Sequence, residues 1–280
     1  MVTNYQLLMF IDSHAHLNIS DFDNTRNKLI PSLLSSSIQV INVGVNKYSS
    51  KRAVEIAEEY DKGVFASVGL HPLNIRSDFT EKKYGKDGEK ESELEKEFDV
   101  KEYKKIANAS KVVAIGEIGL DYWHRPKGES KKAEYKKLQM NIFNQQLDLA
   151  EEMDLPVIIH SRSSFDDTYD VLQKRKLKGV LHCFIGERKD AERFLDMGYV
   201  LGINGVIFRT NMDTFLEWVP MDKILLETDC PYLTPPSFDS EINNPFSLSI
   251  IAQKIADIKA INRTEVEKII TKNTKNLFNI

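Results

Sequence analysis

Histidines and carboxylates stand at the ends of several apolar runs in this sequence. His14 and His16 are separated by one residue, so on a strand both side chains point to the same side. Both can then reach one ion. Imidazole nitrogen suits Zn, Mn, Fe or Co, and carboxylate oxygen suits harder divalent cations. These residue types at this spacing predict a metal centre.

Further potential ligands follow later apolar runs. Glu117, His160, His182 and Asp229 each stand at or just beyond the end of such a run. Two ions about 3.5–4 Å apart need a shared ligand, and a carboxylate can bridge them. We therefore expect Glu117 to bridge two divalent ions, with His160 and His182 on the second. Asp229 is expected to bind one ion and to accept the proton of an attacking water molecule.

Each of these residues also has an ordinary structural interpretation. A single strand histidine is commonly a hydrogen-bonded core residue, Asp229 can be a turn residue before Pro231, and Glu117 can pair with an arginine. Five of the six histidines nevertheless stand at the ends of apolar runs. Taken together, the set favours a metal centre, provided that the fold brings these ends together.

Short β-rich runs alternate with helical patterns along the chain, and most are continuously apolar, which is typical of parallel strands covered by helices. Eight such runs in 280 residues predict an α/β fold, a (β/α)₈ TIM barrel, in which the carboxyl ends of the strands meet at one face. The expected strands are Leu7–Ile11, Ile38–Val45, Val64–Leu70, Val112–Ile118, Pro156–Ile159, Gly179–His182, Tyr199–Ile203 and Ile224–Leu226.

Apolar residues at helical spacing predict helices over Ser49–Tyr60, Lys132–Met153 and residues 248–258. Thr264 and Glu267 are expected to form a capping box for the last helix. No linker rich in proline, glycine or serine divides the chain, so residues 1–280 are expected to form one domain. Residues 77–105 are crowded with Lys, Glu and Asp. They are expected to be a solvated surface insertion with some helix; the alternative is a mobile lid beside the site.

The composition indicates a protein that works without disulfides or a membrane. The two cysteines, Cys183 and Cys230, exclude a disulfide framework; as strand neighbours of expected ligands, they should face away from the ions and pack in the interior. The sequence shows no signal peptide or long apolar run, so we expect a soluble, cytoplasmic protein. The net charge of −4 argues against non-specific coating of nucleic acid, but a loaded metal centre is locally cationic.

Taken together, these motifs resemble the TatD family of metal-dependent deoxyribonucleases, within the amidohydrolase-like barrel superfamily. They occur in the family's order over nearly the whole chain, and the most specific is Gly-Glu-Ile-Gly-Leu-Asp-Tyr at 116–122. The segments that carry the resemblance are 11–16, 69–72, 116–122, 160–162, 182–184 and 227–233.

The resemblance implies a two-metal hydrolase that cleaves phosphodiester bonds in DNA, as a 3'-5' exonuclease. It implies that His71 lies near the substrate phosphate as a hydrogen-bond donor or acid. The related phosphotriesterase and dihydroorotase branches use a carboxylated lysine where this chain has Glu117. The implied ligands are His14, His16, Glu117 and Asp229 for one ion, and Glu117, His160 and His182 for the other. The sequence does not decide among Mg, Mn, Zn, Ni and Fe.

Residues near the ligands are candidates for substrate contacts. Arg162, and with it Arg209, suits a bidentate contact with phosphate, and Tyr122 and Trp123 suit stacking on a base. Packing of these aromatic rings beneath a loop is the alternative, and His124 is expected to be solvated.

Two other functions stay open: hydrolysis of a small amide, lactone or aminoacyl ester on the same scaffold, and binding without catalysis. The sequence does not specify the oligomeric state, and a monomer is compatible with it.

Overall fold

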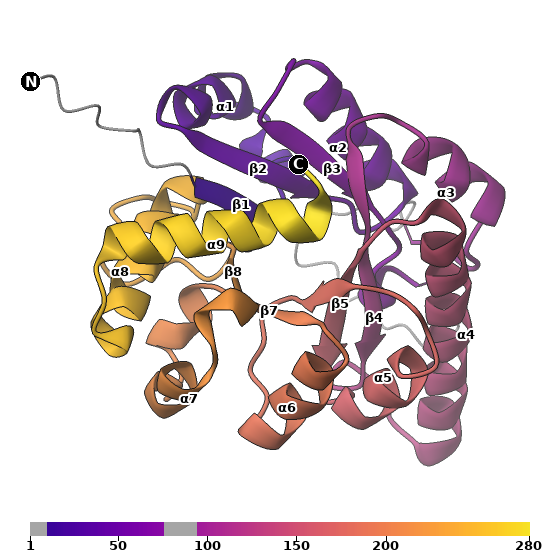
Figure 1. Cartoon of the computed structure of the whole chain (residues 1–280). Helices are drawn as coiled ribbons and strands as arrows, with labels where there is room; N and C mark the ends of the chain where they lie inside the picture. The colour runs from indigo at the N-terminus through magenta and orange to yellow at the C-terminus, as the bar shows by residue number, and fades with distance from the viewer. Residues whose placement is uncertain (1–9, 76–93) are drawn as a thin grey trace, which may run out of the picture.

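Eight parallel strands form the centre of the molecule, and helices surround them (Figure 1). The structure is a computed structural model that describes residues 10–75 and 94–280. Each strand pairs with the next in chain order, which confirms the predicted (β/α)₈ barrel. The strands are β1 (Phe10–Ala15), β2 (Ile38–Val43), β3 (Val64–Val68), β4 (Val112–Asp121), β5 (Val157–Arg162), β6 (Gly179–Leu181), β7 (Val200–Ile203) and β8 (Ile224–Leu226).

Contacts between β1 and the segment after β8 join the two ends of the sheet. The amide of His16 donates to the carbonyl of Cys230 at 3.0 Å, and the amide of Asp229 donates to the carbonyl of His14 at 2.9 Å. The buried carboxylate of Asp12 accepts from the Thr228 amide and hydroxyl at 3.0 and 2.6 Å. These bonds place the first and last predicted motifs side by side.

Several expected strands had the wrong bounds, and three of them, β1, β4 and β5, extend further than predicted. The first was expected at Leu7–Ile11, but β1 begins at Phe10 and continues through His14, while residues 7–9 lie outside the described part of the chain. β4 runs past Ile118 to Asp121, and β5 runs past Ile159 to Arg162. In β1 and β4 the added residues include polar ones that are buried in the barrel, where the apolar pattern does not reveal them.

The helices lie outside the sheet and begin close to the expected positions. Asn46 caps α2 by accepting from the amide of Ser49. The capping box expected from Thr264 and Glu267 is absent, since α9 begins at Arg263 and Glu267 pairs with that residue instead. The helices are α1 (Arg26–Ser35), α2 (Lys47–Glu58), α3 (Val100–Ala107), α4 (Glu129–Met153), α5 (Phe165–Leu172), α6 (Arg188–Asp196), α7 (Asp213–Trp218), α8 (Leu248–Lys259) and α9 (Arg263–Phe278).

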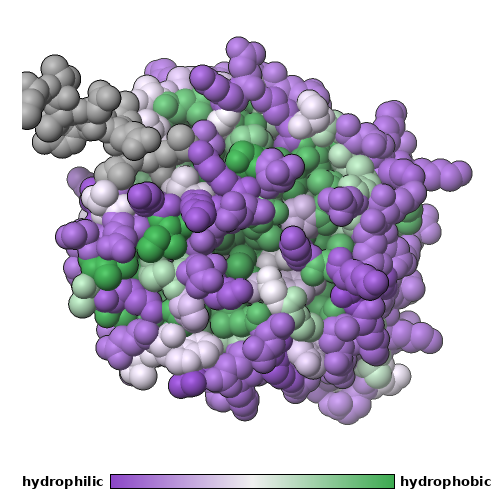
Figure 2. Space-filling model, in the orientation of Figure 1, coloured by the Kyte–Doolittle hydropathy of each residue, from purple (hydrophilic) through white to green (hydrophobic). Residues whose placement is uncertain are grey.

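An apolar layer fills the barrel near the amino ends of the strands. Ile41, Val113, Ile158 and Leu225 meet there, and Phe278 at the end of α9 packs against them. Helix α9 crosses in front of the barrel in Figure 1, so this view looks onto the end that lies opposite the strands' carboxyl ends. Hydrophilic side chains dominate the outline of the same face, and apolar ones appear between them (Figure 2).

The charged segment 77–105 is described only from residue 94 onward. The expected helical part is present as α3. Phe98 and Tyr103 are buried in the main core, and the Tyr103 hydroxyl donates to Glu95 at 2.7 Å. The described part is thus anchored to the barrel rather than fully solvated, because its few aromatic residues face inward. Within the described residues, no helix is long and apolar enough to cross a membrane.

Candidate metal centre

Glu117 lies at the centre of the expected ligand set. Its carboxylate is buried, and its two oxygens face different histidines. Oε2 lies 3.3 Å from Nε2 of His14. Oε1 lies 2.9 Å from Nδ1 of His160 and 3.5 Å from Nε2 of His182. One carboxylate therefore contacts both groups of imidazoles, as a bridging ligand must.

His14, His16 and Asp229 form the first group of donor atoms. The Nε2 atoms of His14 and His16 are 3.1 Å apart, and they lie 3.7 and 3.4 Å from Oδ1 of Asp229. Ligands bound to one ion at about 2.0–2.2 Å are themselves about 3–3.6 Å apart. The spacing and the mixed imidazole and carboxylate chemistry therefore fit a divalent metal ion.

On the other side of Glu117, donor atoms of His71 and His160 lie within 4.8 Å of the carboxylate and of each other, and Nε2 of His182 lies 3.5 Å from Oε1. Nε2 of His71 is 3.4 Å from Oε1 of Glu117, while its Nδ1 accepts a hydrogen bond from the Leu73 amide at 3.1 Å. A neutral imidazole that accepts at Nδ1 carries its proton on Nε2. His71 thus presents a donor toward the centre, which suits a hydrogen-bonding role better than that of a ligand.

Two buried carboxylates behind the histidines were not among the expected site residues. Asp121 Oδ2 lies 3.1 Å from Nε2 of His160, on the far side of the ring from Glu117. Glu227 Oε1 lies 3.0 Å from Nδ1 of His182. Carboxylates commonly orient ligating histidines in this way. Both residues stood inside the quoted motifs, but only the fold shows which imidazole each one contacts.

Gly202 on β7 makes room for one of these carboxylates. A Cβ atom at this position would overlap the carboxylate of Glu227. Asn204, two residues further along, donates from Nδ2 to Oε1 of Glu227, the oxygen that faces His182, at 2.8 Å. The amide of Cys183 also donates to it at 2.8 Å. Neighbouring strands therefore hold Glu227 in one position against His182.

The electrostatic balance keeps the central carboxylates ionised. Burial by itself raises the pKa of Glu117, but His71, His182 and His14 hold that pKa well below its usual value. Burial likewise raises the pKa of Asp229, but His182 and His16 lower it by more, so the pKa of Asp229 is also below its usual value. Ionised carboxylates are the form that binds a cation.

The histidines divide into two electrostatic classes. Burial lowers the pKa of His14 and of His71. Burial also opposes protonation of His160 and His182, but Asp121 raises the pKa of His160 to about 9 and Glu227 raises that of His182 to about 10. In the metal-free protein these two imidazoles are therefore cations that neutralise the buried carboxylates.

Two expectations about neighbouring residues were wrong. Cys183 was expected to face away from the ions. Its Sγ instead lies within 4.8 Å of donor atoms of His182 and Asp229. The reason is that β6 ends at Leu181 and Cys183 adopts a φ of 47°, so strand alternation no longer applies. His124 was expected to be solvated, but it is half-buried and its Nδ1 lies 3.0 Å from Oδ2 of Asp121. Cys230 is buried, as expected.

The two aromatic residues after β4 differ in exposure. Tyr122 is 4% exposed, its hydroxyl donates to Asp167 at 2.7 Å, and the ammonium group of Lys136 lies 3.9 Å from its ring centre. Trp123 is 65% exposed, and the guanidinium of Arg162 lies 5.6 Å from its ring centre. Of the two rings, that of Trp123 is open to a ligand.

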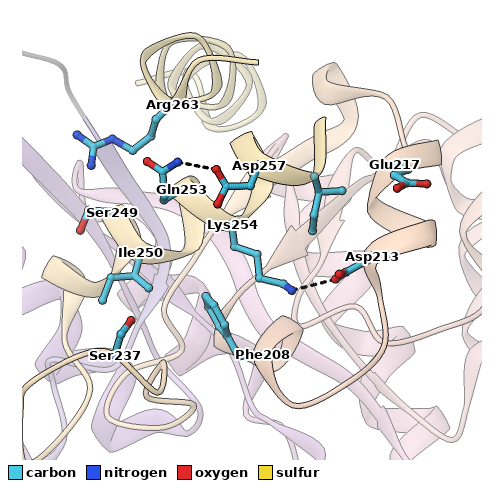
Figure 3. A pocket seen from close by; sticks show the side chains of 11 residues that line it. Phe208, Asp213, Glu217, Ser237, Ser249, Ile250, Gln253, Lys254, Asp257 and Arg263 are labelled. Atoms are coloured by element: carbon cyan, nitrogen blue, oxygen red, sulfur yellow. Dashed lines mark hydrogen bonds and ion pairs between the residues drawn. The ribbon is translucent and has the colours of Figure 1, made fainter. Parts of the chain in front are cut away.

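A separate hollow of about 780 Å³ lies between α7 and α8 (Figure 3). Its charged and polar side chains pair with each other: Lys254 with Asp213 at 2.9 Å, and Gln253 with Asp257 at 2.8 Å. This pairing leaves no convergent set of metal donors there. The hollow therefore does not compete with the barrel mouth as the functional centre.

The sequence pattern of the family described as TatD related DNase matches residues 11–279. This chain belongs to the TatD family. Among its TatD-family relatives, the Bacillus subtilis metal-dependent hydrolase YabD is 33% identical, with 97% of this chain and 100% of that protein covered. A mouse protein provisionally named as the deoxyribonuclease TATDN3 is 30% identical, with 97% and 88% covered.

Solved TatD structures share the fold. The TatD homologue YjjV of Escherichia coli aligns with a TM-score of 0.79 and 25% identity, covering 98% of this chain and 99% of its own. A TatD hydrolase of Entamoeba histolytica aligns at 0.77 with 23% identity, covering 96% and 98%. This TatD-family chain is a metal-dependent hydrolase.

Proposed function

We propose that this TatD-family chain hydrolyses phosphodiester bonds in DNA as a 3'-5' exonuclease, with two divalent ions in the barrel mouth. The observation that carries the proposal is the position of Glu117 between two groups of donors, His14 on one side and His160 and His182 on the other. A single-ion site would not need a carboxylate shared in this way. The family's description as DNases supports the choice of substrate.

The bound ions would supply two effects, a lower pKa for a water molecule and stabilisation of charge on phosphoryl oxygens. The ligands would be His14, His16, Glu117 and Asp229 for one ion, and Glu117, His160 and His182 for the other. Two oxygens of Glu117 support this division, because Oε2 faces His14 while Oε1 faces His160 and His182.

Asp229 is suited to accept the proton of the attacking water. Its carboxylate is 15% exposed, so it reaches the open side of the centre, while Glu117 at 4% does not. The lowered pKa of Asp229 keeps it in the basic form at neutral pH. Such a base contributes about 10²–10⁴-fold to the rate.

His71 and Arg162 are suited to hold the substrate phosphate. His71 is neutral because burial lowers its pKa, and it carries its proton on the nitrogen that faces the centre. Arg162 follows His160 by two residues at the exposed end of β5. Tyr122, the other expected substrate contact, is covered by Lys136, so it would act by holding the Trp123 loop in place.

The test is cleavage of end-labelled single-stranded DNA with each of Mg, Mn, Zn, Ni and Fe, with an EDTA control. A 3'-5' exonuclease shortens a 5'-labelled strand one nucleotide at a time. Glu117→Ala should lose at least about a thousandfold in rate, because two bridged ions would lower the activation barrier by several kcal/mol. Its far-UV circular dichroism should match the wild type, and its bound metal, counted by mass spectrometry, should fall. Cleavage of an aminoacyl ester or lactone without cleavage of DNA would refute the proposal.

A further inference from the structure

An exposed tryptophan–arginine pair stands at the rim of the barrel mouth. Trp123 follows β4 and Arg162 ends β5, and these two strands are neighbours. Arg162 lies two residues beyond His160, which corresponds to about 7 Å along a strand. The amide of Tyr122 donates to the carbonyl of Arg162 at 2.9 Å, which ties the two segments together.

The loop that carries Trp123 is fixed on both sides of the indole. On one side Tyr122 is bound to Asp167. On the other, the amide of His124 donates to Asp121 Oδ1 at 2.8 Å, and its ring contacts Oδ2 at 3.0 Å. The same Asp121 oxygen contacts His160 of the metal centre. An exposed ring held this firmly needs little ordering when it binds a ligand.

The charges around the indole favour an anion. Among the described residues Arg162 forms no ion pair, and Arg125 and Lys127 are exposed in the same loop as Trp123. Large apolar side chains are also exposed at the start of α2 and after β6, where Tyr48 is 63% and Ile185 48% exposed. All follow the carboxyl ends of strands. A ligand for this rim therefore combines a flat apolar surface with negative charge, as a nucleotide does.

We infer that Trp123 and Arg162 form a nucleotide subsite, in which the indole stacks on a base and the guanidinium binds an adjacent phosphate. This inference rests on the proposed function, and it assigns base contact to Trp123 instead of Tyr122. Aromatic rings accept any base, because every base has a π face. The subsite would thus raise affinity for the strand without reading its sequence.

The test compares two single strands of equal length, one with ordinary bases and one in which every nucleotide is abasic. Trp123→Ala should raise KM about tenfold on the base-bearing strand, with kcat nearly unchanged. The same variant should leave KM on the abasic strand unchanged. Trp123→Phe should recover most of the affinity. Arg162→Gln should raise KM on both strands, because both carry phosphates.

Trp218 provides the matched control, since it is the second of two tryptophans and also contacts an arginine, Arg188 at 4.5 Å. Trp218→Phe should keep wild-type kinetics on both strands. This substitution also leaves Trp123 as the single tryptophan, so that tryptophan fluorescence reports on that residue. In metal-loaded Trp218→Phe protein, stopped-flow mixing should show quenching by the base-bearing strand and none by the abasic strand.

Failure of the two proposals can be told apart. If the wild type cleaves neither strand with any metal, the nuclease proposal fails. The subsite is refuted, while the nuclease proposal stands, if the wild type cleaves DNA and Trp123→Ala keeps the wild-type KM. The same holds if Trp123→Ala raises KM by the same factor on the base-bearing and the abasic strand. A change of oligomeric state in Trp123→Ala, with unchanged DNA kinetics, would assign the indole to a protein interface and likewise refute the subsite.

Discussion

Asp121 Oδ2 lies 3.1 Å from Nε2 of His160, so the imidazole is held between this carboxylate and that of Glu117. Asp121 is itself fully buried. A carboxylate in this position fixes the orientation of the ring and increases its basicity as a ligand. Asp121 is therefore a positioning residue, and its effect should appear first in metal binding.

Asp121→Asn should weaken metal affinity about 10–100-fold, because outer partners of ligating histidines contribute on that scale. Activity at limiting metal should fall by a similar factor and recover in excess metal. The measurement is competition with a chelator of known affinity. Asp148→Asn is the matched control, since Asp148 pairs with Arg175 on the surface. Equal metal affinities in the two variants would show that Asp121 does not position His160.

Metal affinity should rise with pH. In the metal-free protein the pKa of His160 is raised to about 9 and that of His182 to about 10, so both carry protons at pH 7. A metal ion has to displace these protons, and its competition with them weakens as pH rises through those values. Calorimetry in two buffers of different ionisation enthalpy should show proton release at pH 7 and much less near pH 10. Metal uptake without proton release at pH 7 contradicts these protonation states.

Gly202→Ala should disturb the centre through Glu227, although Gly202 is not itself a ligand. The added methyl group would overlap the Glu227 carboxylate, which then has to move away from His182. Overpacking of this kind costs about 1–3 kcal/mol of stability, and metal affinity should fall with it.

A double-mutant cycle tests the cause. In a Glu227→Ala background the space is already free, so adding Gly202→Ala should cost little in denaturant unfolding. Additive losses would show that Gly202 acts on something other than Glu227.

Asp229→Asn separates metal binding from proton transfer. The amide oxygen can still bind an ion but is a poor base, so kcat should fall about 10²–10⁴-fold. Bound metal, counted by mass spectrometry, should stay close to the wild-type amount. Kinetics are compared at saturating metal, where weaker binding has no effect. A wild-type kcat in this variant would remove Asp229 from the proton transfer.

The sequence by itself determined the barrel and the rim on which the candidate ligands gather. Apolar runs in alternation with helices predict parallel strands, and the carboxyl ends of such strands meet at one face. Residues as far apart as His14 and Asp229 were expected together on that basis, and the structure places them together. The resemblance to TatD proteins rested on the same residues, and the family comparison confirms it.

Only the tertiary structure decided which atoms face one another. Strand alternation gives the side of a residue within a strand, but it fails where the strand ends, as at Cys183. Periodicity also does not reveal long-range hydrogen bonds, so the contacts of Asp121 with His160 and of Glu227 with His182 appear only in the fold. The exposure of Trp123 beside the buried Tyr122 has the same origin, since it depends on which ring the neighbouring helices cover.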